Sequence, residues 1–344
     1  MVNFKLKEAC FPQLAKSNNI VIIHDNMPVH SIKSELERLS NNVKESIANS
    51  KAQNTLIAYW SDWIDFTLWC EELHLQYLPA TPEVVTMYMA HLTERNLKGS
   101  TIQRRLAAIS RIHKSQGYES PTNTLTVREA WHGMVRQRKI TVAQKGKDAL
   151  LTEHIRLMVN ALLPYGLMGL RDRALLLLGF TGAFRRSELV SLNVEDVLEE
   201  KEGLTVHLQF SKTDQEGQGR DVAILYGTHY ETCPVRTLRE WMQTAHITTG
   251  PLFRRFRFDH LESERLSPQG VARVVKRAAR LAGLDPTNYS GHSLRVGFVT
   301  SALQGGASEM AVMDQTGHKT PTMVRRYRRK VNKYKESPTQ FLGL

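Results

Sequence analysis

The C-terminal part of this chain reads Gly291-His292-Ser293-Leu294-Arg295, later Gly317-His318, and then Arg325-Arg326-Tyr327-Arg328-Arg329-Lys330. A tyrosine among cations supplies a nucleophile together with the positive charge that stabilises a reacting phosphodiester. The two histidines upstream add groups that transfer protons near neutral pH. The stretch predicts an enzyme that cuts and rejoins DNA through Tyr327, although a surface tyrosine that only contacts phosphate would have the same neighbours.

The composition of the chain favours a negatively charged partner. Its 46 Lys and Arg residues against 34 Asp and Glu residues leave a net charge of +12 and an isoelectric point near 9.6. Such an excess attracts polyanions, and phosphate contacts make that attraction depend on salt. A basic protein without a nucleic-acid partner would share this composition. The length of 344 residues predicts two domains, each with its own core.

Cofactor and membrane motifs are missing from the sequence. The three cysteines lie far apart without a Cys-x-x-Cys pair, which argues against a disulfide framework or a zinc site. The longest apolar run, at 174–178, is too short to cross a bilayer, and the N-terminus lacks the apolar core of a signal peptide. There is no Walker-type loop and no acidic cluster for a metal pair. We therefore expect a cytoplasmic, DNA-associated protein without membrane segment, metal or small-molecule cofactor.

Helical periodicity marks a first domain at residues 46–143. Residues 1–45 carry no repeat or strong period and are expected to form an accessory or partly disordered arm. Apolar residues then recur at three- and four-residue spacing over 56–70, which predicts a helix with one buried stripe. A second helix is expected at Thr81-Pro82-Glu83, where an N-cap precedes a proline, and a third at 100–117. This domain is predicted to bind DNA.

A basic linker is expected to separate this domain from a second one. Residues 131–147 contain no acidic residue, and Gln144-Lys145-Gly146-Lys147 has linker character, so we place the boundary near residue 145 and the linker at 144–150. The linker is either a plain tether or a segment that crosses the DNA backbone and lets two lobes close around a duplex. The catalytic domain is expected at 151–330, followed by a C-terminal tail at 331–344.

The second domain is predicted to be mainly helical with one β-hairpin. Thr152 can cap a helix, residues 171–180 predict a buried helix, and Ser267-Pro268 starts another. Apolar and polar residues alternate over 204–210, the turn-forming run 214–219 follows, and residues 222–225 can return as the partner strand. The fold class is therefore mainly α with a small β-hairpin or sheet (α+β), in a two-lobed arrangement that clamps DNA.

Cations on the predicted helices and in the basic segment are candidates for contacts with DNA phosphates, although a solvated basic surface is the alternative. These DNA-binding candidates are Arg104, Arg105, Arg111, Lys114, Arg136, Arg138, Lys139, Arg273 and Arg277.

Phosphodiester transfer needs an activated hydroxyl, positive charge around the non-bridging oxygens, and an acid for the departing oxygen. Tyr327 would attack, and it needs a neighbouring base because a free phenol has a pKa of about 10. Arg185 and Arg295 can clamp the phosphate through bidentate contacts, with Glu188 buttressing Arg185, although each could be a surface ion pair. Lys212 can protonate the leaving 5′ oxygen, although most lysines beside turns are only solvated.

The ordered set of motifs resembles the tyrosine recombinase family, also called the phage integrase family, and its simple Cre-type members in particular. The resemblance covers residues from about 50 to 330. It rests on Thr-Gly before Arg185, the Arg-x-x-Glu spacing to Glu188, Ser-Lys-Thr around Lys212, His-x-x-Arg, and Gly-His nine residues before the tyrosine. The spacing selects Arg185 over its neighbour Arg186. By resemblance, the catalytic places are filled by Arg185, Glu188, Lys212, His292, Arg295, His318 and the nucleophile Tyr327.

The resemblance also implies the course of the reaction. The tyrosine would form a 3′-phosphotyrosine without metal or ATP, and exchange would pass through a Holliday junction to integrate, excise or resolve a DNA element. The partner is double-stranded DNA at a specific site, bound by a monomer or dimer on one site and by a homotetramer on two. The tail after Tyr327 either docks on a neighbouring protomer or stays disordered. The alternatives are relaxation of DNA like that of type IB topoisomerases and a non-catalytic DNA-binding regulator.

Overall fold

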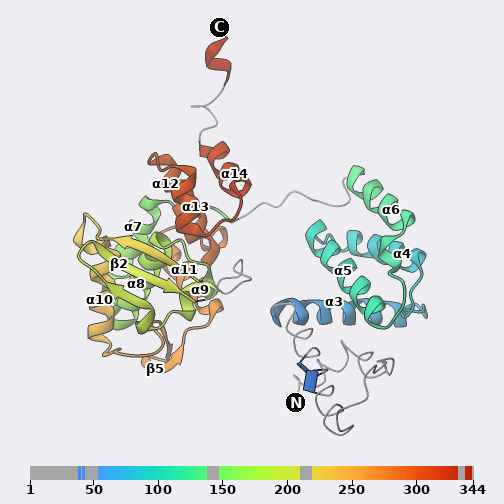
Figure 1. Cartoon of the computed structure of the whole chain (residues 1–344), viewed down its shortest axis with the longest axis horizontal. Coiled ribbons are helices and arrows are strands. Elements are labelled where there is room, and N and C mark those ends of the chain that lie inside the picture. The colour runs from blue at the N-terminus through green and yellow to red at the C-terminus, as the bar shows by residue number, and fades with distance from the viewer. Residues whose placement is uncertain are drawn as a thin grey trace, which may run out of the picture. The chain divides into compact units, whose positions relative to one another are not determined.

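The computed structural model describes residues 38–39, 41–42, 53–137, 147–209, 219–331 and 338–342. The chain divides into two compact units, residues 1–145 and residues 146–344 (Figure 1). Most of the described residues are helical, and the strands all lie in the second unit, so the described part of the chain is mainly α with small β-sheets. None of the described helices combines the length and the apolar character needed to span a bilayer.

The first unit is built from helices that enclose an aromatic core. Thr81 caps the second of them as expected, because its hydroxyl accepts the Val84 N–H at 3.4 Å and Pro82 follows in the first turn. In the core, the rings of Phe66 and Tyr88 meet edge to face with centroids 5.0 Å apart. Within residues 53–137, the helices of this unit are α3 (Gln53–Glu72), α4 (Pro82–Glu94), α5 (Gly99–Ser115) and α6 (Leu125–Arg136), with the short 3₁₀ helix η2 (Pro121–Asn123).

A buried histidine joins two parts of this core. His113 accepts the Ala80 N–H on Nε2 at 2.8 Å, so its other ring nitrogen, Nδ1, carries the proton and donates to the Ile109 carbonyl at 2.8 Å. Burial lowers the pKa of His113 and favours this neutral form. The three expected helices of the first unit are thus confirmed, and a fourth, α6, follows them within residues 53–137.

The second unit is organised around one buried helix, α8. Its residues from Gly169 to Phe180 are almost all out of contact with solvent, in agreement with the buried helix predicted at 171–180. The helix α7 begins at Thr152, but Leu151 rather than Thr152 occupies the N-cap position, and its N–H donates to His154 Nδ1 at 3.2 Å. The helices α12, α13 and α14 pack on one another (Figure 1, red).

The bounds of the helices in the second unit are as follows. The α-helices are α7 (Thr152–Ala161), α8 (Gly166–Thr181), α9 (Arg186–Ser191), α10 (Pro234–Thr244), α11 (Pro268–Leu281), α12 (Gly291–Gln304), α13 (Glu309–Thr316) and α14 (Pro321–Val331). The 3₁₀ helices are η3 (Leu163–Tyr165), η4 (Val194–Asp196), η5 (Tyr230–Thr232), η6 (Pro286–Asn288) and η7 (Pro338–Phe341).

The predicted hairpin is present and is part of a three-stranded antiparallel sheet. The strands are β1 (Val197–Glu199), β2 (Gly203–Leu208) and β3 (Arg220–Leu225), in the order β1-β2-β3. Val206 lies opposite Val222 and Leu208 lies opposite Arg220. Alternate residues of β2 and β3 are buried against the helices, which is the period of two that the sequence indicated.

The expectation of a single hairpin was wrong, because the structure contains a second one. It consists of β4 (Arg254–Arg257) and β5 (His260–Arg265), which pair antiparallel with an irregularity between Arg254 and Phe256. These strands are rich in charged residues and carry few buried apolar side chains. Their hydrophobic pattern is therefore too weak to indicate a strand.

Candidate active site

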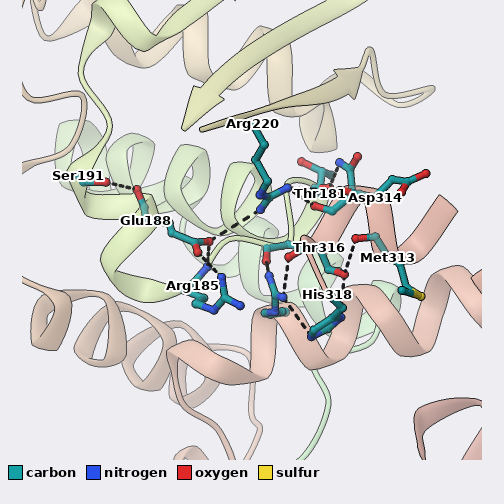
Figure 2. Close-up of polar contacts among 12 residues, drawn as sticks. Thr181, Arg185, Glu188, Ser191, Arg220, Met313, Asp314, Thr316 and His318 are labelled. Carbon is teal, nitrogen blue, oxygen red and sulfur yellow. Dashed lines mark hydrogen bonds and ion pairs between the residues drawn. The ribbon is translucent and has the colours of Figure 1, made fainter. Parts of the chain in front are cut away.

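Arg185 and Glu188 form a reciprocal pair at the start of α9. The N–H of Arg185 donates to Glu188 Oε2 at 2.9 Å, and the Arg185 guanidinium donates to Glu188 Oε1 (Figure 2). The Glu188 side chain is buried, whereas that of Arg185 is one-fifth exposed. The carboxylate therefore fixes the Arg185 guanidinium beside the start of α9, where charge-assisted contacts to an anion would be strong. Arg186 is exposed at the surface and lies against Gly291.

Arg295 is the more deeply buried of the predicted catalytic arginines, both of which the structure describes. Its Nη1 donates to the Ala183 carbonyl at 2.8 Å and its Nη2 donates to the Thr316 carbonyl at 2.6 Å. Ala183 has a φ of +51°, in the left-handed region that non-glycine residues seldom adopt, which turns the chain sharply between α8 and α9. Burial, followed by the charge of Arg185, lowers the pKa of Arg295 to about 10, so the group stays protonated at neutral pH.

His318 is held in one tautomer by its neighbours. The Thr316 hydroxyl donates to the Val312 carbonyl at 2.6 Å, so it accepts from His318 Nδ1, 2.8 Å away. The other ring nitrogen, Nε2, accepts from Arg295 Nη2 at 3.1 Å. Burial, followed by the charges of Arg295, Arg185 and Arg220, lowers the pKa of His318 to about 4. The imidazole is therefore neutral at pH 7.

His292 stands in the first turn of α12, one helical turn before Arg295, so the two side chains share a face of the helix. His292 is exposed, yet partial burial lowers its pKa, and the charges of Arg295, Arg186 and Arg185 lower it further. A neutral imidazole that remains accessible can accept a proton from a substrate or from a neighbouring side chain.

Tyr327 lies on α14 and is half-buried. Its ring packs against a small apolar cluster of α12, α13 and α14 that contains Val299, Val312 and Val324. The phenol is near enough to Arg295 that a negative charge on its oxygen would raise the pKa of Arg295. The cluster thus holds the ring of Tyr327 on α14, within electrostatic reach of Arg295.

Several predicted residues fall outside this description or take part in internal contacts. Lys212, Arg138 and Lys139 lie outside the described residues, although β2 and β3 flank the segment that carries Lys212. Among the other DNA-binding candidates, the structure leaves three exposed and engages three in ion pairs, and Arg111 is half-buried. The exposed residues are Lys114, Arg136 and Arg273, and the engaged residues are Arg104 with Asp62, Arg105 with Asp65, and Arg277 with Asp172.

Sequence reasoning missed three contributors to this site: Arg220, Thr316 and Ala183. Arg220 begins β3 and lies 3.9 Å from Glu188 Oε2. A cation at the start of a strand carries no motif, and the roles of Thr316 and Ala183 depend on their hydroxyl and carbonyl oxygens rather than on spacing. Across the described ranges, no group of three or more His, Cys, Asp or Glu side chains could hold a metal ion.

Comparison with known proteins places these features in a family. Residues 149–333 match the family model described as Phage integrase family, and residues 45–115 match that of the phage integrase N-terminal SAM-like domain. The chain belongs to the phage integrase family, the tyrosine recombinases. It is an enzyme of site-specific DNA recombination, and neither topoisomerase-like relaxation nor non-catalytic DNA binding is favoured.

Individual proteins that are similar to this tyrosine recombinase support the family assignment. The integrase/recombinase XerD homologue of Selenomonas ruminantium is 41% identical over 333 residues, which cover 94% of this chain and 96% of that protein. The recombinase Cre of Escherichia phage P1 is 22% identical over 335 residues, covering 92% and 96%. The fold is similar to that of the XerH site-specific recombinase in a post-cleavage complex with its difH substrate. That match has a TM-score of 0.65 and 16% identity, and it covers 98% of this chain and 95% of the other.

Proposed function

We propose that Tyr327 is the nucleophile with which this recombinase cleaves one strand of a specific DNA site. Its oxygen attacks the phosphorus, a tyrosine–3′-phosphate bond forms, and the bond to the 5′ oxygen breaks. Attack by a 5′ hydroxyl of the partner strand reverses these changes and releases the tyrosine. No net bond energy is lost, so the exchange is expected to need neither a nucleotide nor a metal.

The observation that carries this proposal is the convergence of Arg185, Arg295 and His318, with Tyr327 in electrostatic reach of Arg295. Two guanidinium groups can neutralise the non-bridging oxygens, which gain charge in the transition state. A bound phosphate would accept hydrogen bonds from Arg295 N–H groups that now donate to the carbonyls of Ala183 and Thr316. Lys212 would protonate the departing 5′ oxygen.

His292 is the best candidate for the group that accepts the tyrosine proton. Its lowered pKa favours the neutral form at pH 7, and the residue is exposed one helical turn before Arg295 on α12. His318 is neutral as well, but its Nδ1 proton and its Nε2 lone pair are both engaged within the protein. We therefore propose that His318 orients Arg295 and contacts the phosphate rather than taking the proton.

We further propose the division of labour between the two units. Residues 46–143 would be the core-binding domain, 144–150 the linker and 151–330 the catalytic domain. The match of residues 45–115 to a SAM-like domain and of 149–333 to the integrase family supports this assignment. Double-stranded DNA would be held through phosphates by exposed cations, among them Lys114, Arg136 and Arg273.

A homotetramer on two sites would be joined partly by the tail at 331–344. Two observations support docking of this tail on a neighbouring protomer. Phe341 and Leu342 are 82% and 63% exposed, which is costly for apolar side chains. The second unit also has an apolar hollow of about 560 Å³, lined by residues of α7, α8, β3, α12 and α13 that include Leu177, Ile224 and Phe298.

The proposal is tested by incubating the protein in EDTA with DNA that contains its recombination site and resolving the products on a denaturing gel. The wild type should form a covalent protein–DNA adduct, and Tyr327→Phe should form none. Tyr230→Phe is the matched control, because Tyr230 is an exposed tyrosine of the same unit on η5. An adduct that persists in Tyr327→Phe would overturn the assignment of the nucleophile.

A further inference from the structure

Arg220 reaches from the three-stranded sheet into the centre of the predicted active site. It opens β3 opposite Leu208, and only 18% of its side chain is exposed. Figure 2 shows its guanidinium between Glu188 on one side and the end of α13 on the other. Nη1 donates to the Gln315 carbonyl at 2.8 Å, and Nη2 lies 3.9 Å from Glu188 Oε2. One side chain thus touches both the carboxylate that holds Arg185 and the helix that precedes His318.

Arg220 contacts α13 at its C-terminal end, where a positive charge stabilises a helix. The last carbonyls of an α-helix have no partner within the helix and form the negative end of its dipole. Arg220 supplies a donor to one of these carbonyls and lies 3.5 Å from the next, that of Asp314. It therefore closes the C-terminal end of the helix from outside.

The guanidinium also lies against the turn that orients His318. Gly317 ends α13 with a φ of +66°, the left-handed conformation that glycine adopts most easily. A Cβ atom at Gly317 would lie 3.0 Å from Arg220 Nε and 3.4 Å from Arg220 Cζ, so the guanidinium packs closely against the glycine. The direction in which His318 leaves this turn is thereby constrained.

The placement of Arg220 has a cost that packing alone does not offset. Its Nε and Nη2 are buried and make no hydrogen bond within the described part of the chain. Burial lowers the pKa of Arg220, the Glu188 carboxylate raises it, and the charge of Arg185 lowers it again. A buried cation with unmet donors is destabilising, so its presence beside reacting groups points to function.

We propose that Arg220 is a positioning residue for strand transfer: it holds Glu188 and the turn at 315–317 in fixed relation and thereby aligns Arg185 and His318 on the scissile phosphate. Arg220 does not itself touch the phosphate. The inference rests on the proposed function, because alignment matters only if those two residues contact the reacting group.

The charges around His318 provide a readout of this role that needs no DNA. The charged groups that lower its pKa come from three parts of the fold: Arg295 and His292 on α12, Arg185 before α9, and Arg220 on β3. Removal of the Arg220 charge should therefore raise the pKa of His318 above its present value of about 4. A residue that served only to fill space would leave this titration unchanged.

Two substitutions and one control test the proposal in the full-length protein. Arg220→Met removes the charge and the donors, and Arg220→Lys keeps the charge without the planar fork. Arg220→Met should slow adduct formation in a single turnover by about 10²-fold, as expected when reacting groups are displaced by about 1 Å. The rate of adduct formation by Arg220→Lys should lie between that of the wild type and that of Arg220→Met. Arg239→Met is the control. It removes a cation of α10 that pairs with Glu199, away from this site, and it should leave the rate of adduct formation unchanged.

Three measurements are made on each variant: the adduct rate, the salt dependence of DNA binding, and the imidazole titration of His318 by NMR, assigned with His318→Gln. We expect Arg220→Met to lose rate, to keep the salt slope, and to titrate His318 at higher pH. An unchanged titration in a folded Arg220→Met variant would overturn the proposal, whatever happened to the rate. If the wild type formed no adduct, the proposed function would fail, while the titration would still decide whether Arg220 acts on His318.

Discussion

Replacement of His318 by glutamine should change how the stability of this protein depends on pH. In the folded chain the pKa of His318 is about 4, against about 6.5 for an unconstrained histidine. Between these values the unfolded chain binds a proton that the folded chain does not, so stability is full above pH 6.5 and is lost as the pH falls toward 4. Glutamine can still accept from Arg295 and donate to Thr316, but it does not titrate.

The magnitude follows from the two pKa values. Integrating proton binding from pH 7 to pH 5 removes about 2 kcal/mol from the free energy of unfolding of the wild type, and going on to pH 4 brings the loss to about 3 kcal/mol. The variant lacks this contribution, so the difference in stability between the two proteins should move in favour of the variant by these amounts as the pH falls.

Urea unfolding followed by circular dichroism, at pH 7, 6, 5 and 4.5, measures the difference directly. All other titrating groups are common to both proteins and largely cancel. A difference in the free energy of unfolding that stays constant between pH 7 and pH 5 would refute the reasoning. It would mean that His318 titrates near its ordinary pKa and that the cationic surroundings in the structure do not act on it.

Three further outcomes are expected. Asp172→Asn should lower the free energy of unfolding by about 3–5 kcal/mol in urea titrations, because the carboxylate is wholly buried between two arginines that would lose their partner. Gly297→Ala should lower it by about 1–3 kcal/mol, because the new methyl group would lie 1.9 Å from a backbone carbonyl, whereas Gly133→Ala, with open space around it, should raise the melting temperature slightly. Arg185→Met should reduce adduct formation by about 10²-fold or more, and Arg186→Met should retain it within about threefold; the reverse order on the denaturing gel would reassign the clamp.

Much of the fold could be predicted because its signals are local. The alternation of Leu204, Val206 and Leu208 indicated β2, and each of these side chains is buried. The pair Thr81-Pro82 marked the start of α4 because capping and a fixed φ act within one turn. The spacing of motifs also named the residues that the structure brings together at α9, α12 and the end of α13.

The rest depends on contacts between distant segments. Arg105 was predicted to face DNA from its place on a basic helix, but its side chain is 11% exposed and pairs with Asp65, forty residues earlier in the chain. Arg277 likewise pairs with Asp172 on another helix. Helical periodicity tells which side chains point outward from one helix but not which carboxylate meets them. The part of Arg220 in the site could not be predicted for the same reason, since its partners lie on α9 and α13.

The central claim is that Tyr327 becomes covalently joined to DNA. Mass spectrometry of the purified adduct tests it most directly, after digestion with nuclease and with chymotrypsin or pepsin, since trypsin would cut at the arginines on both sides of the tyrosine. We predict a nucleotide remnant on a peptide that contains Tyr327, attached through the phenolic oxygen to a 3′ phosphate. A remnant on any other residue, or linkage to a 5′ phosphate, would contradict the assignment.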